Sequence, residues 1–251
     1  MINDESINQL RRDALLKLLQ QDHGAGTAKA ARRPILPINR GQPLPLSFAQ
    51  QRLWFLDQLD SAASAAYHMP TGLRLAGTLD RTALRATLDR LVARHEVLRT
   101  TFVKTGGEPA QVIAPPESGS ALSEHDLRGL SDAGQRAAVA ERSQAEATLP
   151  FDLATGPLIR GQLLRLADDQ HVLLVTQHHI ICDGWSIGVL VKEVSVLYSA
   201  FSRGQPDPLA PLTIQYADYA AWQRRWLQGG IIQRQVEFWR EHLSGAPTLL
   251  E

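Results

Sequence analysis

The clearest feature of the hydrophobic pattern is an uninterrupted apolar run at residues 172–175, which is typical of a buried strand. Apolar residues then recur at helical spacing from residue 187 to residue 201, and this spacing predicts a helix. The ten residues that join them, 177–186, read Gln-His-His-Ile-Ile-Cys-Asp-Gly-Trp-Ser. Titratable side chains at the end of a buried strand are costly without partners, so this segment is the first candidate for chemistry.

The remaining pattern predicts an α/β (α+β) fold, in which helices flank a mixed sheet and the strand before His178 is central and buried. Alternating segments separated by short turns predict two hairpins and one further strand. The predicted strands are residues 71–76, 100–104, 110–113, 158–166 and 171–178. The predicted helices are residues 47–59, 80–94, 133–147, 187–201, 216–227 and 231–243, and residues 115–123 are predicted to form a loop.

The first 33 residues differ in character from the rest. Residues 6–21 carry a rough apolar stripe that predicts a short amphipathic helix, and residues 24–33 are small and basic, as in a linker. We therefore divide the chain into a helical leader with its linker, residues 1–33, and a globular part, residues 34–251. A packed or frayed leader is the preferred interpretation, and a docking element for a neighbouring protein or domain is the alternative.

Composition narrows the possible partners. Basic and acidic residues number 26 each, so the formal net charge is zero and neither nucleic acid nor an anionic membrane is indicated. The single cysteine, Cys182, excludes an internal disulfide framework and fits a reducing compartment. No apolar run is long enough to span a bilayer, and charged residues interrupt the N-terminus where a signal peptide needs an apolar core. These features predict a cytoplasmic protein.

The two adjacent histidines are the candidates for proton transfer. Successive strand residues point to opposite faces, so His178 and His179 cannot both face one cavity unless the strand has already ended. One of them is then free to act while the other packs. Imidazole is the side chain best suited to proton transfer near neutral pH.

Asp183 and Gly184 follow the histidines at the predicted bend. We expect the Asp183 carboxylate to be structural, because it needs a guanidinium or several hydrogen bonds if it is buried. Arg99 is the preferred partner, and Arg160 is the rival. Gly184 permits either a positive φ or a close approach of the backbone.

Other interpretations of the segment remain open on the residues alone. A metal site could use His178, His179 and Asp183, but the opposed strand faces argue against it and no second cluster of ligands is evident. Cys182 could be a nucleophile, although it lacks a glycine-flanked elbow and a buried cysteine is often only a small hydrophobic residue. Both histidines could also be structural, each satisfied within a core.

The spacing His178-His179-x-x-x-Asp183-Gly184 resembles the HHxxxDG signature of the condensation domains of nonribosomal peptide synthetases, which belong with the chloramphenicol acetyltransferase-like acyltransferases. Three further segments resemble motifs of that family and occur in the same order along the chain. They are residues 46–54 (LSFAQQRLW), 94–102 (RHEVLRTTF) and 216–222 (YADYAAW).

The resemblance implies the N-terminal lobe of a chloramphenicol acetyltransferase-like fold at residues 34–251, with the second lobe missing. It implies acyl transfer to an amine: a carrier-bound aminoacyl α-amine attacks an upstream acyl or peptidyl thioester. His179 would accept or orient the proton, His178 would pack, Asp183 would hold the loop, and the N–H near Gly184 would bind the oxyanion. Because the family's active site lies between two lobes, we expect the lobe alone to be inactive and to expose an apolar surface.

The resemblance also implies partners rather than bound cofactors or metals. Substrates would arrive on the 4'-phosphopantetheine arms of donor and acceptor carrier domains, beside an adenylation domain and the missing C-terminal lobe. Two alternatives stay open. One is a starter-type domain that N-acylates the first amino acid from an acyl-coenzyme A, as in lipopeptide initiation, and the other is a non-catalytic docking or scaffold fragment.

Overall fold

The structure, a computed structural model, describes residues 34–60, 63–228 and 230–246. The chain divides into two units, Met1–Pro34 and Ile35–Glu251, and the description below concerns the second. The predicted leader helix at residues 6–21 and the linker at residues 24–33 lie outside the described residues.

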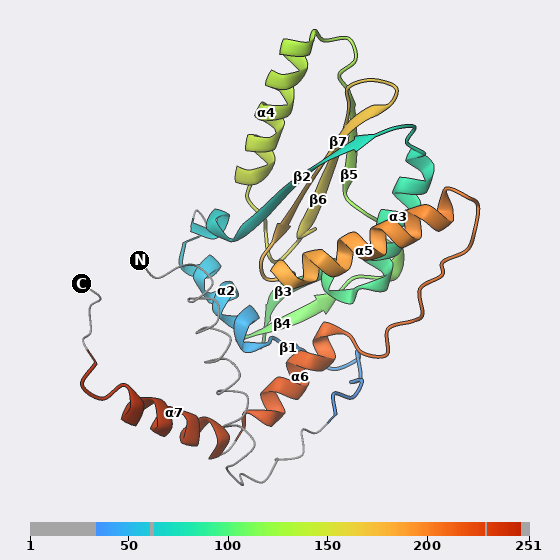
Figure 1. Cartoon of the computed structure of the whole chain (residues 1–251). Coiled ribbons are helices and arrows are strands. Elements are labelled where there is room, and N and C mark those ends of the chain that lie inside the picture. The colour runs from blue at the N-terminus through green and yellow to red at the C-terminus, as the bar shows by residue number, and fades with distance from the viewer. Residues whose placement is uncertain (1–33, 61–62, 229, 247–251) are drawn as a thin grey trace, which may run out of the picture. The chain divides into compact units, whose positions relative to one another are not determined.

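A four-stranded mixed sheet carries the strand that leads to the two histidines (Figure 1). Its order is β2-β7-β6-β5, so β7 is paired on both sides, and the prediction of an interior, buried strand is confirmed. β7 pairs antiparallel with both neighbours, whereas β5 pairs parallel with β6. The strands are β2 (His68–Ala76), β5 (Leu122–Asp126), β6 (Ile159–Arg165) and β7 (Gln170–His178).

A second, three-stranded sheet has the order β1-β4-β3 (Figure 1). The predicted hairpin at residues 100–113 forms its β3–β4 pair. β1 was not predicted, because its two residues lie in a proline-rich segment, and it pairs with β4 through Leu44 and Pro45. The strands are β1 (Leu44–Pro45), β3 (Thr100–Thr105) and β4 (Glu108–Ile113).

Side chains that cap helix N-termini set where most of the helices begin. Ser47, Asp80, Ser131 and Asp183 each accept a hydrogen bond from a backbone N–H in the first turn of the helix that follows. The helices are α2 (Phe48–Leu59), α3 (Arg81–Arg94), α4 (Asp132–Thr148), α5 (Gly184–Phe201), α6 (Tyr216–Trp226) and α7 (Gly230–His242). Short 3₁₀ turns occupy Ala63–Tyr67, Glu96–Arg99 and Pro116–Ser118. None of the helices in the described ranges has the length and apolar character needed to cross a membrane.

Helices cover both faces of the larger sheet, and alternating residues of β7 pack against them. On one face Leu173 packs with Leu84 of α3, and α3 lies along α5. On the other face Leu174 belongs to a cluster with Val139 of α4 (Figure 1). A third cluster, at the end of β7 where the histidines lie, buries Ile180 and other residues. It joins Leu46, Leu91, Val92, Leu98, Phe102, Phe151, Leu153, Leu158, Ile181 and Leu197.

Candidate active site

The strand β7 ends in a tight turn that separates the two histidines. The N–H of Ile181 donates to the carbonyl oxygen of His178 at 3.1 Å, and the N–H of His179 donates to the carbonyl oxygen of Tyr67 at 2.8 Å. Ile180 and Ile181 are both buried in the core cluster, and their burial holds the turn in place. Backbone hydrogen bonds and the burial of Ile180 and Ile181 therefore fix the main chain on both sides of His179, independently of the contacts of the His179 side chain.

His178 is directed into the core, where its side chain is fully buried. Its Nδ1 accepts the N–H of Ile180 at 3.1 Å, so the ring proton is on Nε2, which lies 3.2 Å from Oγ of Ser64. The rings of His68 and Phe151 pack edge-on against it. Burial, with smaller contributions from His68 and His179, lowers the pKa of His178 to about 4. The ring is thus neutral at pH 7 and occupied on both nitrogens.

His179 is exposed and points the other way, as the strand geometry predicts. Its Nδ1 lies 2.6 Å from the carbonyl oxygen of Cys182, and only a protonated nitrogen can donate to that oxygen. The neutral ring therefore carries its proton on Nδ1 and presents an unprotonated Nε2. This is the arrangement that a general base needs, because a backbone carbonyl fixes both tautomer and ring direction.

His179 lines a cavity of about 1050 Å³. The cavity is bounded by α2, by the turn after β7, by the first turns of α5 and by the segment that leads into α6. Its walls are mainly apolar and aromatic, and its polar groups converge from several elements. The polar and aromatic lining residues are Arg52, Tyr67, His95, His179, Asp183, Trp185, Ser186, Gln215, Tyr216 and Tyr219.

Among the described residues Asp183 pairs with neither Arg99 nor Arg160, so the predicted ion pair is wrong. Asp183 is exposed, and its carboxylate caps α5 by accepting the backbone N–H of Ser186 at 2.8 Å and its hydroxyl at 2.7 Å. These hydrogen bonds lower the pKa of Asp183. Arg99 donates to the carbonyl oxygens of Ala114 and Ala93 instead, and Arg160 pairs with Glu146 and covers the ring of Phe151. An exposed carboxylate at a helix N-terminus needs no guanidinium, because backbone N–H groups satisfy it.

Gly184 opens α5, and its φ is not positive, so the left-handed alternative does not apply. The space around the position where a Cβ would stand is open, which leaves room for a substrate to approach the backbone.

Cys182 is buried, and burial raises the pKa of its thiol to about 12. A thiol that stays protonated is a poor nucleophile, which argues against the nucleophilic-cysteine alternative. No group of three or more His, Cys, Asp or Glu among the described residues could hold a metal ion.

Several residues around the site gave no functional signal in the sequence. Gln50 of α2 is buried beneath the motif, with Nε2 3.5 Å from the carbonyl oxygen of Ile180. His95, the C-cap residue of α3, lines the cavity with its Nε2 2.6 Å from Oε2 of Glu193 on α5. Gln50 lies in segment 46–54 and His95 in segment 94–102, and both segments resemble family motifs. The motifs therefore locate the elements that carry these residues, but they do not predict the contacts that the residues make.

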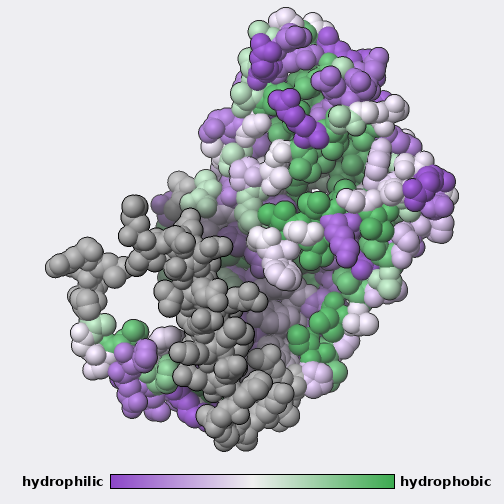
Figure 2. All heavy atoms as spheres, viewed as in Figure 1, coloured by the Kyte–Doolittle hydropathy of each residue, from purple (hydrophilic) through white to green (hydrophobic). Residues whose placement is uncertain are grey.

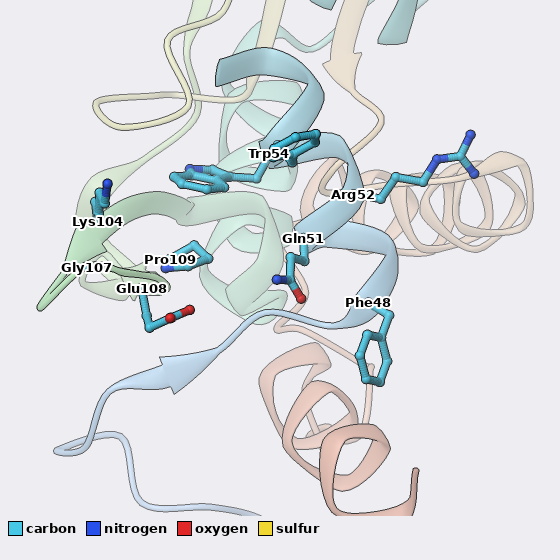
Figure 3. A pocket seen from close by; sticks show the side chains of 9 residues that line it. Phe48, Gln51, Arg52, Trp54, Lys104, Gly107, Glu108 and Pro109 are labelled. Atoms are coloured by element: carbon cyan, nitrogen blue, oxygen red, sulfur yellow. The ribbon is translucent and has the colours of Figure 1, made fainter. Parts of the chain in front are cut away.

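A second hollow lies on the other side of α2, against the β3–β4 hairpin (Figure 3). Trp54 and Gln51 project into it, whereas Arg52 projects from the opposite side of the helix and also lines the His179 cavity (Figure 3). Among the described residues Arg52 thus brings a positive charge to the wall of the histidine cavity from α2.

Comparison with known proteins identifies what this arrangement is similar to. Residues 41–250 match the sequence model of the family described as "Condensation domain". Malpibaldin synthetase of Mortierella alpina is 51% identical over 214 residues, which are 85% of this chain and 4% of that protein. Chondramide synthase cmdD of Chondromyces crocatus is 44% identical over 224 residues, 89% of this chain and 6% of that protein.

A solved structure, the complex of the X-domain and OxyB from teicoplanin biosynthesis, shares the fold with a TM-score of 0.75 and 34% identity. The match covers 88% of this chain and 48% of that one. The chain therefore spans about half the length of the solved relative and a small part of each synthetase.

Proposed function

This chain belongs to the condensation domain family, and on that premise we propose that it forms one wall of a site for amide-bond formation on nonribosomal peptide synthetases. The substrates would be an acyl or peptidyl thioester, as donor, and the α-amine of an aminoacyl thioester, as acceptor. The observation that carries the proposal is the orientation of His179, whose Nδ1 is bound by the carbonyl of Cys182 and whose Nε2 is left for the cavity.

In the proposed reaction the acceptor nitrogen attacks the donor carbonyl carbon and a C–N bond forms. His179 Nε2 accepts or orients the proton of that nitrogen. The tetrahedral oxyanion collapses and the C–S bond breaks, so that the proton passes to the departing thiolate sulfur. An α-amine has a pKa of about 8, so a strong base is not required and positioning contributes much of the effect.

The oxyanion would be stabilised at the start of α5. Asp183 already satisfies the N–H of Ser186, and the N–H of Gly184 lies at the first position of the helix, beside open space. An aligned helix N-terminus carries partial positive charge, and Arg52 adds a full charge to the same cavity. His178 and Asp183 are positioning residues in this proposal: one anchors the turn in the core, and the other fixes the first turn of α5.

Partners follow from the substrates. Carrier domains would deliver the donor and the acceptor on 4'-phosphopantetheine arms, and an adenylation domain would load the acceptor. A C-terminal lobe, which the family resemblance implies, would form the opposite wall of the cavity. Figure 2 shows hydrophobic residues gathered along α5 and over the sheet beside it. Trp185 at the cavity mouth is 86% exposed, as expected of a wall that another part of a domain covers.

The proposal is tested in a condensation domain that joins these residues to such a C-terminal portion, with donor and acceptor thioesters preloaded on carrier proteins. Single-turnover amide formation is measured for wild type and His179→Ala, together with melting curves. Loss of a positioned acid–base group lowers the rate by about 100- to 10,000-fold, with little change in melting. Val112→Phe, on the exposed surface of β4 and outside both cavities, is the control and keeps the wild-type rate. A near-normal rate for His179→Ala contradicts the proposal.

A further inference from the structure

His95 lies between a carboxylate and the cavity that contains His179. It is the C-cap residue of α3 and lines that cavity, and its Nε2 lies 2.6 Å from Oε2 of Glu193 on α5. A carboxylate only accepts hydrogen bonds, so the ring proton of the neutral histidine is on Nε2. Nδ1 is left as an acceptor, and it is neither buried nor bound to a partner among the described residues. The cavity therefore has a second imidazole with an unused nitrogen.

The contacts around His95 fix the direction of its ring. Arg94 Nε lies 3.2 Å from Oε1 of Glu193, so both oxygens of that carboxylate are held. The side chain of Gln215 accepts the backbone N–H of Glu96 at 3.1 Å and donates to the carbonyl oxygen of Arg94 at 2.9 Å. The backbone is thus tied on both sides of His95, and the hydrogen bond of the ring sets its tautomer. Such a group is preorganised to bind, because little freedom is lost when a ligand orders it.

A purely structural role would leave the free nitrogen of His95 unexplained. Arg94 already joins α3 to α5 through Glu193 and compensates the charge of the carboxylate. The histidine then adds a bare acceptor to a wall that includes Leu98 and Leu190. When a substrate fills the cavity and displaces water, an unpaired acceptor there weakens binding by roughly 10-fold, unless the substrate supplies a donor. The wall therefore favours substrates that carry an N–H or O–H group at this point.

We propose that His95 is a specificity-determining residue, whose Nδ1 accepts a hydrogen bond from an N–H or O–H group of the acceptor substrate. Glu193 is its positioning residue. The inference rests on the proposed function, which places the reacting amine at His179. Glu193 is nine residues after Gly184, or about 13 Å further along α5, so the donor group is several bonds away from that amine.

Two parts of the acceptor can carry such a donor. One is the side chain of the amino acid, if it ends in a hydroxyl or an amide, and the other is the amide N–H groups of the pantetheine arm. Both present the same chemistry to Nδ1 of His95. Five compounds separate them: the pantetheine amides of tyrosine, phenylalanine, glutamine and norleucine, and norleucyl butylamide, which lacks the arm. An amide in place of the thioester keeps all five intact during the measurement.

The test follows the ring nitrogens of His95 by long-range ¹H–¹⁵N NMR of the 251-residue chain, titrated with each compound. The chain has eight histidines, and the His95 signals are those missing from the spectrum of His95→Phe. If the side chain is the source, the tyrosyl and glutaminyl compounds shift Nδ1 and bind about 10-fold more tightly than the phenylalanyl and norleucyl compounds. If the arm is the source, norleucyl-pantetheine shifts Nδ1 and norleucyl butylamide does not.

His95→Phe is expected to remove whichever preference the wild-type chain shows. His242→Phe is the matched control, because it makes the same change at an exposed position of α7 that does not line the cavity. This control keeps the wild-type affinities and the wild-type shifts of His95.

Glu193→Gln tests the positioning role without removing the ring. Arg94 would hold the carbonyl oxygen of the side-chain amide, which turns the amide N–H towards His95 and moves the ring proton to Nδ1. The ¹⁵N spectrum reports this change of tautomer, and the preference for donor-bearing compounds is expected to disappear with it. A contact that only supports the fold would not give this result. The same variant carries the test if His95→Phe does not fold.

The inference is overturned if none of the compounds shifts the His95 signals at about 10 mM, which is enough to fill a site with a Kd on the order of 1 mM. It is also overturned if the preference survives in His95→Phe or in Glu193→Gln. The measurement follows binding and needs no turnover. A normal rate for His179→Ala therefore refutes the proposed function separately from this result.

Discussion

The carboxylate of Asp218 lies 2.6 Å from Nη1 of Arg40, a residue 178 positions earlier in the chain. Asp218 is 1% exposed, and it also accepts the backbone N–H groups of Ile38 and Gln215. Arg40 in turn pairs with Glu96, just after α3. One buried carboxylate therefore ties the extended segment before β1 to the start of α6.

We expect Asp218→Asn to lower the free energy of unfolding by about 2–4 kcal/mol. Removing one charge of a buried pair leaves the other uncompensated, and the partial exposure of Arg40 moderates the cost. Urea denaturation measures the change. The matched control is Asp168→Asn, since Asp168 is 81% exposed and its pairs with Arg128 and Arg165 contribute little. Equal effects of the two substitutions would refute the distinction.

The buried ring of His178 makes stability depend on pH. Its pKa is about 4 in the folded chain and 6.5 in the unfolded chain, so the folded state binds fewer protons between these values. The stabilisation is present above pH 6.5 and is lost as the pH falls towards 4, by ~3 kcal/mol in total. His178→Gln should flatten the curve of unfolding free energy against pH in this window. Parallel curves for the two proteins would show that the ring does not titrate as described.

Asp183 should act as a helix cap. Asp183→Ala removes the acceptor for Ser186 and should cost about 1 kcal/mol, whereas Asp183→Asn keeps a capping oxygen and should cost a few tenths. Thermal melting of the two variants at pH 7 measures the difference. Asn as costly as Ala would mean that the charge of Asp183, and not its capping geometry, is what the fold requires.

Cys182 should be unreactive in the folded chain. The rise of its pKa from 9.0 to about 12 lowers the thiolate fraction near pH 8 by about 1000-fold, and burial adds a steric barrier. Mass spectrometry should find the native chain unmodified by iodoacetamide under conditions that alkylate the urea-unfolded chain fully. Rapid alkylation of the native chain would reopen the nucleophile interpretation.

The hydrophobic pattern was sufficient to predict the elements that bury apolar residues on a regular period. The two hairpins and the interior position of β7 are confirmed. A short apolar run such as residues 172–175, bounded by turn residues, is typical of a buried strand and fits few other structures. β5 was predicted as part of a loop up to residue 123. Its sequence, LSEHD, is mostly polar, and its parallel pairing with β6 spans a long connection that no local pattern encodes.

The sequence was sufficient to predict which residues form the candidate site, but it did not predict the contacts that these residues make. Strand alternation separates His178 from His179, and the motif spacing identifies the turn. The pairing of Asp183 with Arg99 or Arg160 was wrong because the prediction assumed a buried carboxylate, whereas the chain leaves the core after Cys182. Ser64 and Gln50 touch the site from elements far away in sequence, and such contacts depend on tertiary packing.

The pairing of β7 has a consequence for exchanging segments between related domains. His178 is opposite His68 on β2, and a shift of the strand by a single residue would turn His179 into the core and His178 into the cavity. A chimera that joins two parents between residues 166 and 178 must therefore keep the strand length unchanged. A change of two residues would preserve which histidine faces the cavity but would move it along the sheet by about 7 Å, away from the carbonyl of Tyr67 that accepts the N–H of His179.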